Sequence, residues 1–322
     1  MHHLVLDGTA EGALGVALDV FDAARRLAST TLRARAVASK VVSTDGRAVR
    51  AGNGRRLAVD GAFRSRALRR GDVILIAGLS ATTEVAIERL LARDEVVSVV
   101  QSLARAGRRG VIVAASCSAT FLLGAAGLLD GREATTTWWL ADAFAKRFPR
   151  VRLSRHRMVV ADRGVITAGA ALAHADLALG LTARLVGASV AHDVGRYLVL
   201  DDRPSQSRYM VLEHLRSSDP VVRALEAHIE ANLDATLSLE ALARAMATSP
   251  RTLARRIAAA AGTTPQKLVQ RVRMMRAAHW LETTDESVES VARRVGYADP
   301  AAFRRMLRAH TGRSPRELRR VR

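Results

Sequence analysis

The only cysteine of the chain, Cys117, lies inside the long apolar stretch GVIVAASCSATFLLGAAGLL, residues 110–129. This stretch predicts a buried strand, an abrupt turn at Ser116–Cys117–Ser118, and then an apolar helix. A strand-to-helix turn of this kind presents a nucleophile at the edge of a sheet, and the helix dipole lowers the pKa of a thiol at its N-terminus. A catalytic cysteine also needs a base within hydrogen-bond reach, usually a histidine. The pattern therefore predicts a pocket at Cys117 and leaves open whether it is catalytic.

Arginines recur at matched positions of a repeat in the last third of the chain, where guanidinium groups can bind DNA. The two copies are residues 239–268 and 288–318. An internal duplication is the sequence signature of a repeated structural unit. The matched residues are Ala243 and Ala292, Pro250 and Pro300, Leu253 and Phe303, Arg255 and Arg305, Ile257 and Leu307, Gly262 and Gly312, and Pro265 and Pro315.

Each copy has the pattern of a helix-turn-helix unit. Ser249 and Asp299 occupy predicted N-cap positions, and a proline follows each of them at the first helical position. At helical spacing one stripe of the second helix is apolar and must face the core. The core residues predicted in this way are Leu253, Ile257, Phe303 and Leu307.

The opposite face of each second helix is basic. It carries Arg251, Arg255 and Ala258 in the first copy, and Ala301, Arg305 and Arg308 in the second. Arginines exposed near the start of such a helix are placed to enter the major groove of DNA and to contact guanine with two hydrogen bonds.

The charge of the chain favours a polyanionic partner. The formal net charge is +19, and residues 251–276 contain six arginines, one lysine and no acid. Residues 293–322 contain ten arginines against two acids. A merely solvated helix face would mix the signs more evenly, so the placement favours DNA. Residues 25–70 are also strongly basic, and the sequence assigns this patch no role.

The length and residue pattern predict two domains. With 322 residues the chain can bury two cores. In the first half, strand patterns (HLVL, RARAVAS, DVILIAG, GVIVAAS, GVITAG) alternate with helical ones, which predicts a flavodoxin-like α/β fold, a mostly parallel sheet with helices on both faces. We expect this domain over residues 1–200, a partly helical linker over 201–219, and an all-α domain with two helix-turn-helix units over 220–322.

The second half resembles the AraC/XylS family of bacterial transcription regulators, through LSLEALARAMATSPRTLARRIAAAAGTTPQKL and SVARRVGYADPAAFRRMLRAHTGRSPREL. The resemblance implies two helix-turn-helix units joined by a long helix at about residues 265–282, reading two successive major-groove faces of promoter DNA. The resemblance also implies that Arg251, Arg255, Ala301 and Arg305 contact the DNA bases. Arg256, Arg304 and Arg308 suit phosphate contacts, and Thr252 completes the predicted DNA-binding set.

The first half resembles the PfpI-like branch of the class I glutamine amidotransferase superfamily, in the version fused to AraC-type domains, over about residues 3–200. The segment CSATFLLGAAGLLDGREATTTWW carries the resemblance. In that family a histidine commonly follows "ATT", whereas this chain has Thr137, so the expected base is missing. The family also tends to place an acid near the cysteine, here Glu11 or Asp19. The predicted pocket residues are Cys117, Ser118, Thr137, Trp138 and His174.

These patterns predict a cytoplasmic, sequence-specific DNA-binding transcription regulator, whether activator or repressor. Its partners would be double-stranded DNA with promoter half-sites, a small-molecule effector bound by a non-catalytic first domain, and a second copy of the chain. The alternative is a cysteine-dependent amidase or peptidase of the PfpI type with an accessory DNA-binding domain. A third interpretation is a DNA-binding protein whose first domain only dimerises. No cofactor or metal is predicted, because His2–His3 lacks further ligands.

Overall fold

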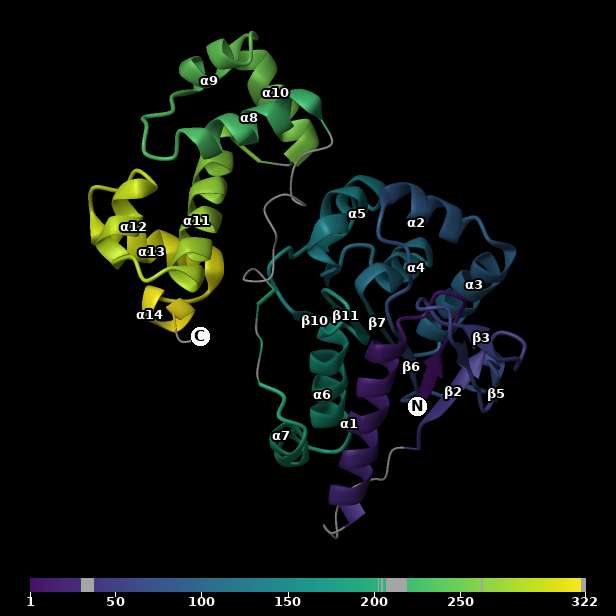
Figure 1. Cartoon of the computed structure of the whole chain (residues 1–322). Helices are drawn as coiled ribbons and strands as arrows, with labels where there is room; N and C mark the ends of the chain where they lie inside the picture. Colours follow the sequence, from purple (N-terminus) through teal and green to yellow (C-terminus); the bar gives the residue numbers. More distant parts are fainter. Residues whose placement is uncertain (30–37, 202, 204, 207–218, 262, 320–322) are drawn as a thin grey trace. The chain divides into compact units, whose positions relative to one another are not determined.

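The strands of the first half form one seven-stranded sheet in the computed structural model (Figure 1). The structure describes residues 1–29, 38–201, 203, 205–206, 219–261 and 263–319. All neighbouring strands are parallel except β10 and β11. The strands in spatial order are β10 (Val159–Asp162), β11 (Val165–Ala168), β7 (Ile112–Ser116), β6 (Val73–Ile76), β1 (His2–Leu4), β2 (Lys40–Ser43) and β5 (Gly61–Ala62).

Helices cover both faces of the sheet, because the central strands are apolar on both sides. In β6, Val73 and Leu75 pack against one helical layer, while Ile74 and Ile76 pack against the other. The first layer contains α1 (Glu11–Ser29), α6 (Ala173–Leu185) and α7 (Ala188–Tyr197). The second contains α2 (Glu84–Leu91), α3 (Asp94–Arg108), α4 (Thr120–Ala125) and α5 (Ala141–Arg147). The predicted α/β class is confirmed.

The end of β7 lies between two parallel neighbours. Ile76 of β6 is paired with Ala115, and Ala168 of β11 is paired with Ser116. The carboxyl ends of three strands therefore meet where Cys117 begins the next turn. Ligands of parallel α/β sheets bind outside such carboxyl ends.

The edge of the sheet differs from the sequence prediction. Strand β10 is antiparallel to β11, and Arg163 and Gly164 connect the two strands with positive φ angles of 46° and 85°. Two such residues form the tight hairpin turn that matches the twist of the strands. The predicted strand at 33–39 lies mostly outside the described residues, and β2 begins at Lys40. Two small sheets pair β3 (Val49–Arg50) with β4 (Arg56–Leu57), and β8 (Glu133–Ala134) with β9 (Arg152–Leu153).

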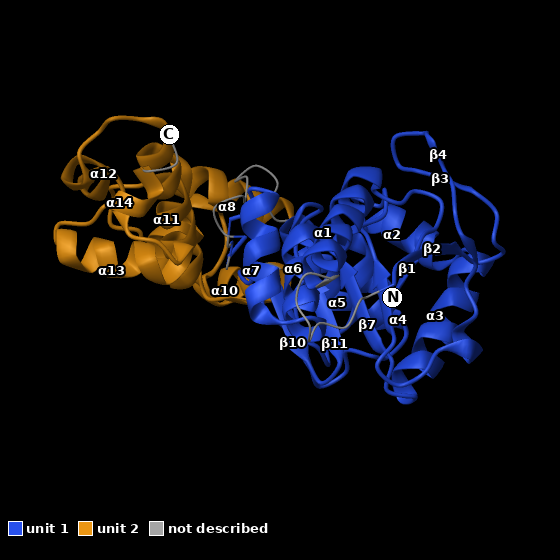
Figure 2. Cartoon of the chain, turned by 90° about the horizontal axis from the view of Figure 1, so that it is seen from below, with its two compact units in different colours: residues 1–206 blue, residues 207–322 orange. Residues whose placement is uncertain are grey.

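The second half is helical throughout its described residues. The helices are α8 (Pro220–Ala231), α9 (Leu239–Ala245), α10 (Pro250–Ala261), α11 (Pro265–Thr283), α12 (Val288–Arg294), α13 (Pro300–Thr311) and α14 (Pro315–Arg319). The chain divides into compact units of residues 1–206 and 207–322 (Figure 2). Of the predicted linker, residues 202, 204 and 207–218 lie outside the described residues.

The apolar stretch 110–129 is divided between two elements of the first unit. Its first part is β7, which is buried throughout, and its second part contains α4, which packs into the core beneath the sheet. Across the part of the chain that the structure describes, no helix has the length and apolar character needed to cross a bilayer. The interpretation of this stretch as a buried strand plus helix is confirmed.

Candidate functional site

Each copy of the repeat folds as two helices joined by a tight turn, α9 with α10 and α12 with α13. The turns share one backbone feature, a left-handed residue at the matched position: Ala247 has a φ of 49° and Gly296 a φ of 78°. The next backbone N–H, of Thr248 or Tyr297, donates to the carbonyl of Ala243 or Ala292. This bond closes each turn in the manner of a helix C-terminus.

The predicted caps and core positions of the repeat are confirmed. The hydroxyl of Ser249 accepts from the backbone N–H of Thr252 at 3.2 Å, and the carboxylate of Asp299 accepts from two backbone N–H groups of the first turn of α13. The four predicted core residues, Leu253, Ile257, Phe303 and Leu307, have no exposed surface. Burying them fixes which face of α10 and α13 points outward.

The outward face of α10 and α13 presents the predicted base-reading residues. Arg251, Arg255, Ala301 and Arg305 are all exposed. Arg251 and Arg255 form no ion pair with a described acid, whereas a guanidinium nitrogen of Arg305 lies 3.9 Å from the carboxylate of Asp299. The first helix-turn-helix unit therefore leaves its arginines freer to contact a ligand than the second helix-turn-helix unit does.

The predicted phosphate-contacting residues differ in their surroundings. Arg256 lies 3.3 Å from Asp219, the N-cap of α8, and Arg304 donates to Glu289 at 2.8 Å. Arg308 is exposed, and the hydroxyl of Thr252 accepts from Ser249 at the start of α10. A surface ion pair contributes at most about 1 kcal/mol, so these pairs hold Arg256 and Arg304 only loosely.

Three arginines that raise the charge of residues 251–276 serve the fold of the second unit. On α11, Arg271 lies 2.9 Å from Glu226 and Arg276 lies 3.4 Å from Glu230, so both bind α11 to α8. Arg273 donates to the carbonyl of Ala235 at 2.6 Å. A count of charges in the sequence cannot separate these residues from those on the outward face, because only the fold shows where each guanidinium points.

Cys117 sits on a strained elbow at the carboxyl edge of the sheet in the first unit. Its φ of 55° is rare for a residue with a side chain. Its backbone N–H donates to the carbonyl of Gly169 at 2.7 Å, and its own carbonyl accepts from the hydroxyls of Thr120 and Thr136. These bonds hold a conformation that a free chain avoids.

The thiol of Cys117 is not activated, contrary to the sequence expectation. Only 6% of the residue is exposed, and burial raises the pKa of the thiol. Ser118 and Thr137 act in the opposite direction with less effect. The hydroxyl of Thr137 makes no hydrogen bond of standard geometry to a described residue, yet it lies close enough to the thiol to favour the thiolate. The helix dipole is weak here because a 3₁₀ turn, η2 (Cys117–Ala119), separates the thiol from the short helix α4.

The histidines and carboxylates that could assist the Cys117 thiol lie elsewhere or are bonded to other residues. His174 is fully buried, and its Nδ1 lies 2.9 Å from the hydroxyl of Ser116, not from the thiol. Burial lowers the pKa of His174 to about 3, so its imidazole is neutral at physiological pH. Glu11 accepts from Asn53 and lies 3.6 Å from Arg55, while Asp19 is exposed on α1. His156 is exposed.

The five predicted pocket residues form a closed region of the core. Cys117, Ser118, Thr137, Trp138 and His174 are each at most 7% exposed, and Trp138 packs edge-to-face on Trp139 at 5.1 Å. An open hollow of about 1020 Å³ lies elsewhere, between α6, α7 and β10, and none of these five residues lines it. Among the described residues no group of His, Cys, Asp and Glu is arranged to hold a metal ion.

Gln206, which the sequence analysis did not single out, inserts its side chain beside the elbow. It is 1% exposed, and its Nε2 donates to the carbonyls of Thr136 and Arg155 at 3.0 and 3.1 Å. Its Oε1 has no hydrogen-bond partner among the described residues and lies over Gly169, so that a Cβ added to Gly169 would come within 2.3 Å of it. Thr136 and Gly169 are both bonded to the backbone of Cys117. The last residue of the first unit therefore touches both segments that hold the elbow.

Comparison with known proteins identifies both units. Residues 5–184 match the DJ-1/PfpI family, and residues 242–321 match the family described as helix-turn-helix domain. The HTH-type transcriptional regulator GbdR of Pseudomonas aeruginosa is 30% identical over 86% of this chain and 73% of its own length. The regulator CdhR of the same species is 30% identical over 87% and 81%, and GlxA of Rhizobium meliloti is 28% identical over 68% of each chain.

Solved structures share the fold of the first unit. An AraC family transcriptional regulator from Pseudomonas putida matches with a TM-score of 0.51 at 22% identity, over 61% of this chain and 97% of that chain. A ThiJ/PfpI family protein from Pseudomonas syringae matches with a TM-score of 0.51 at 21% identity, over 72% and 86%.

Proposed function

This chain belongs to the AraC-type transcriptional regulators that carry a DJ-1/PfpI domain, and from that premise we propose that its first unit senses a small-molecule effector without catalysing a reaction. The chain is a DNA-binding transcriptional regulator. The observation that carries the proposal is the state of Cys117, a buried thiol with a raised pKa, while the candidate base His174 is hydrogen-bonded to Ser116. A buried thiol with a raised pKa, and with no described histidine hydrogen-bonded to it, lacks the activation that acyl transfer requires.

The labelling rate of Cys117 tests whether the first unit is catalytic. We expect iodoacetamide to alkylate the native chain at pH 8 at least about 100-fold more slowly than the chain in urea, because only an accessible thiolate reacts. The raised pKa lowers the thiolate fraction, and burial blocks access. Amide hydrolysis by the full chain should not differ from that of Cys117→Ser. Rapid native labelling, or hydrolysis that disappears in Cys117→Ser, would restore the amidase interpretation.

We assign DNA contact to the outward faces of α10 and α13. Arg251, Arg255, Ala301 and Arg305 would read bases, Arg256, Arg304 and Arg308 would bind phosphates, and Thr252 would complete the DNA-binding set. The exposure of Arg251, Arg255, Ala301 and Arg305, and their placement opposite the buried stripe, support the assignment. We further propose that the first unit forms a homodimer, because pairing two DNA modules raises their effective concentration on repeated half-sites. Sedimentation of the full chain tests the dimer, and a monomer at micromolar concentration would contradict it.

We propose that Gln206 couples the effector site to the second unit. The residue anchors the chain directly before residues 207–218, which lead to the DNA-binding unit. The region beside Cys117, Thr136 and Gly169 is closed while Gln206 fills it, so an effector would enter only by displacing the carboxamide from this space and from its hydrogen bonds. Its binding would then release the anchor. A ligand shifts a conformational equilibrium only through such a difference in affinity between two states.

Limited proteolysis measures the anchor without knowledge of the effector. Gln206→Ala removes the hydrogen bonds to Thr136 and Arg155, a loss of about 2 kcal/mol, so trypsin should cleave after Arg208 about 10- to 100-fold faster. Ser205→Ala, which loses one hydrogen bond to the carbonyl of His156, serves as the matched control and should change the rate little. Equal cleavage of wild type and Gln206→Ala would show that Gln206 anchors nothing.

A further inference from the structure

Seven exposed arginines gather at one end of the first unit, and DNA reading by the second unit gives them no role. They are Arg64, Arg66, Arg69 and Arg70 before β6, and Arg105, Arg108 and Arg109 at the end of α3. The two segments are adjacent, since the N–H of Gly71 donates to the carbonyl of Gly110, and Arg109 donates to the carbonyls of Ser65 and Arg66 at 3.4 and 3.0 Å. We call this set the arginine end. Its first four members belong to the basic stretch that the sequence left unassigned.

The arginine end has little counter-charge within the described residues. Residues 61–72 and 101–110 contain one acid, Asp72, whose carboxylate accepts from the backbone N–H of Arg69. None of the seven arginines forms an ion pair with a described acid. Like charges held together lower the stability of the folded chain, and a bound polyanion would relieve that repulsion.

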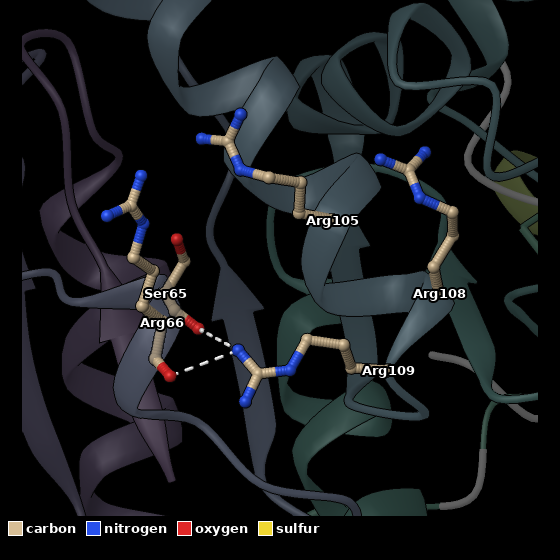
Figure 3. Close-up of a pocket in the computed structure, with 5 residues that line it drawn as sticks. All are labelled: Ser65, Arg66, Arg105, Arg108 and Arg109. Atoms are coloured by element: carbon tan, nitrogen blue, oxygen red, sulfur yellow. Dashed lines mark hydrogen bonds between the residues drawn. The ribbon is translucent and has the colours of Figure 1, made fainter.

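Four of these arginines surround a hollow of about 250 Å³, together with Ser65 (Figure 3). The two hydrogen bonds to carbonyls hold the guanidinium of Arg109, which lines the hollow, and Arg105 donates to the hydroxyl of Ser102 at 2.9 Å. Figure 3 shows the side chains of Arg66, Arg105 and Arg108 extending in one direction, away from Arg109. The hollow has room for a phosphate group with water, and no aromatic side chain lines it to stack on a base.

We propose that the arginine end binds backbone phosphates of duplex DNA beside the operator that the second unit reads. Arginine is suited to this contact because its planar fork matches a phosphate with two hydrogen bonds. An open surface with seven cations spread over two segments fits a repeating line of phosphates better than it fits one small anion. Because the second unit already holds DNA, tethering gives the first unit a high effective concentration of phosphates, and even a weak contact is then occupied.

Salt dependence on duplexes of two lengths tests the proposal. The full chain is compared with Arg105→Glu/Arg108→Glu on a duplex that holds the operator alone and on one extended by about 30 base pairs. On the extended duplex we expect the variant to bind about 10- to 100-fold more weakly at low salt, and the slope of log K against log salt to fall in magnitude by about 2. On the short duplex the two proteins should bind alike. Urea unfolding of both proteins checks that the variant is folded.

Arg184→Glu/Arg196→Glu is the matched control, because it makes the same charge change at exposed residues of α6 and α7, on the opposite face of the sheet. It should bind the extended duplex as wild type does. An unchanged slope for Arg105→Glu/Arg108→Glu would overturn the proposal, as would an equal loss in the control. Stabilisation of wild type by pyrophosphate, or its binding to anionic phosphatidylserine vesicles, lost in the variant while DNA binding stays unchanged, would instead assign the arginine end to a small anion or a membrane surface.

Discussion

Arg255→Ala should weaken binding to the preferred operator by about 1–3 kcal/mol, which is about 5- to 150-fold, and should relax the preference at one base pair. Arg255 lies on the exposed face of α10 and forms no ion pair with a described acid, and the N-cap of this helix, Ser249, is uncharged. No described acid of the second unit therefore competes with DNA for the guanidinium of Arg255. The measurement is equilibrium binding at one salt concentration, on an operator selected by the wild-type chain from random sequences.

Replacing the matched residue of the second repeat, Arg305, should weaken operator binding less. Arg305 lies 3.9 Å from Asp299, a charged N-cap where the first repeat has serine. To reach DNA, Arg305 must give up this attraction, and the Asp299 carboxylate also repels nearby phosphates. Arg305→Ala should therefore cost less than Arg255→Ala on the same operator.

Arg304→Ala separates base reading from phosphate contact. Its guanidinium lies 2.8 Å from Glu289, on the side of α13 that faces α12. The variant should weaken binding on all sequences alike and lower the magnitude of the salt slope by about 1. If Arg255→Ala also weakens every sequence equally, the assignment of base reading to Arg255 is wrong.

The repeat made the second unit predictable from sequence. Prolines after Ser249 and Asp299 mark where the recognition helices begin, and the stripe of Leu253 with Ile257 fixes their buried face. These are local rules of capping and periodicity, and each depends on residues within a few positions of one another. The same rules identified the buried strand before Cys117. Local rules also explain why the fold class of both halves was accessible without a structure.

The contacts that could not be predicted from the sequence join residues that are far apart in the chain. The pairs of Arg271 with Glu226 and of Gln206 with Thr136 join residues 45 and 70 positions apart. No periodicity in the sequence relates such positions. The same limit explains why the expected lowering of the Cys117 pKa was wrong, because the pKa of the thiol depends on burial that residues far apart in the sequence create. Gln206 could not be identified from the sequence, because it is one polar residue among several in the segment that we assigned to the linker.

Two buried histidines should make the first unit unstable in mild acid. Burial lowers the pKa of His174 to about 3 and, with the adjacent N-terminal amine, that of His3 to about 4. Each value lies below the ordinary pKa of about 6.5, so between these limits the unfolded chain binds a proton that the native chain excludes. The free energy of unfolding therefore falls as the pH falls from about 6.5. At pH 4 the loss is about 3 kcal/mol for each histidine, of the order of half the stability of a typical domain.

His174→Asn tests this account, because asparagine keeps a hydrogen-bonding group near Ser116 and does not titrate. In a Trp280→Phe background, the remaining tryptophans, Trp138 and Trp139, report unfolding of the first unit alone. Urea titrations from pH 7 to pH 4 should show the free energy of unfolding of the parent falling by up to about 1.4 kcal/mol per pH unit for each excluded proton. In His174→Asn one proton fewer is excluded, so the slope should be smaller by up to about 1.4 kcal/mol per pH unit. His192→Asn, at an exposed position on α7, should leave the pH slope unchanged. A slope that His174→Asn does not reduce would mean that the buried imidazole takes up its proton without unfolding the unit.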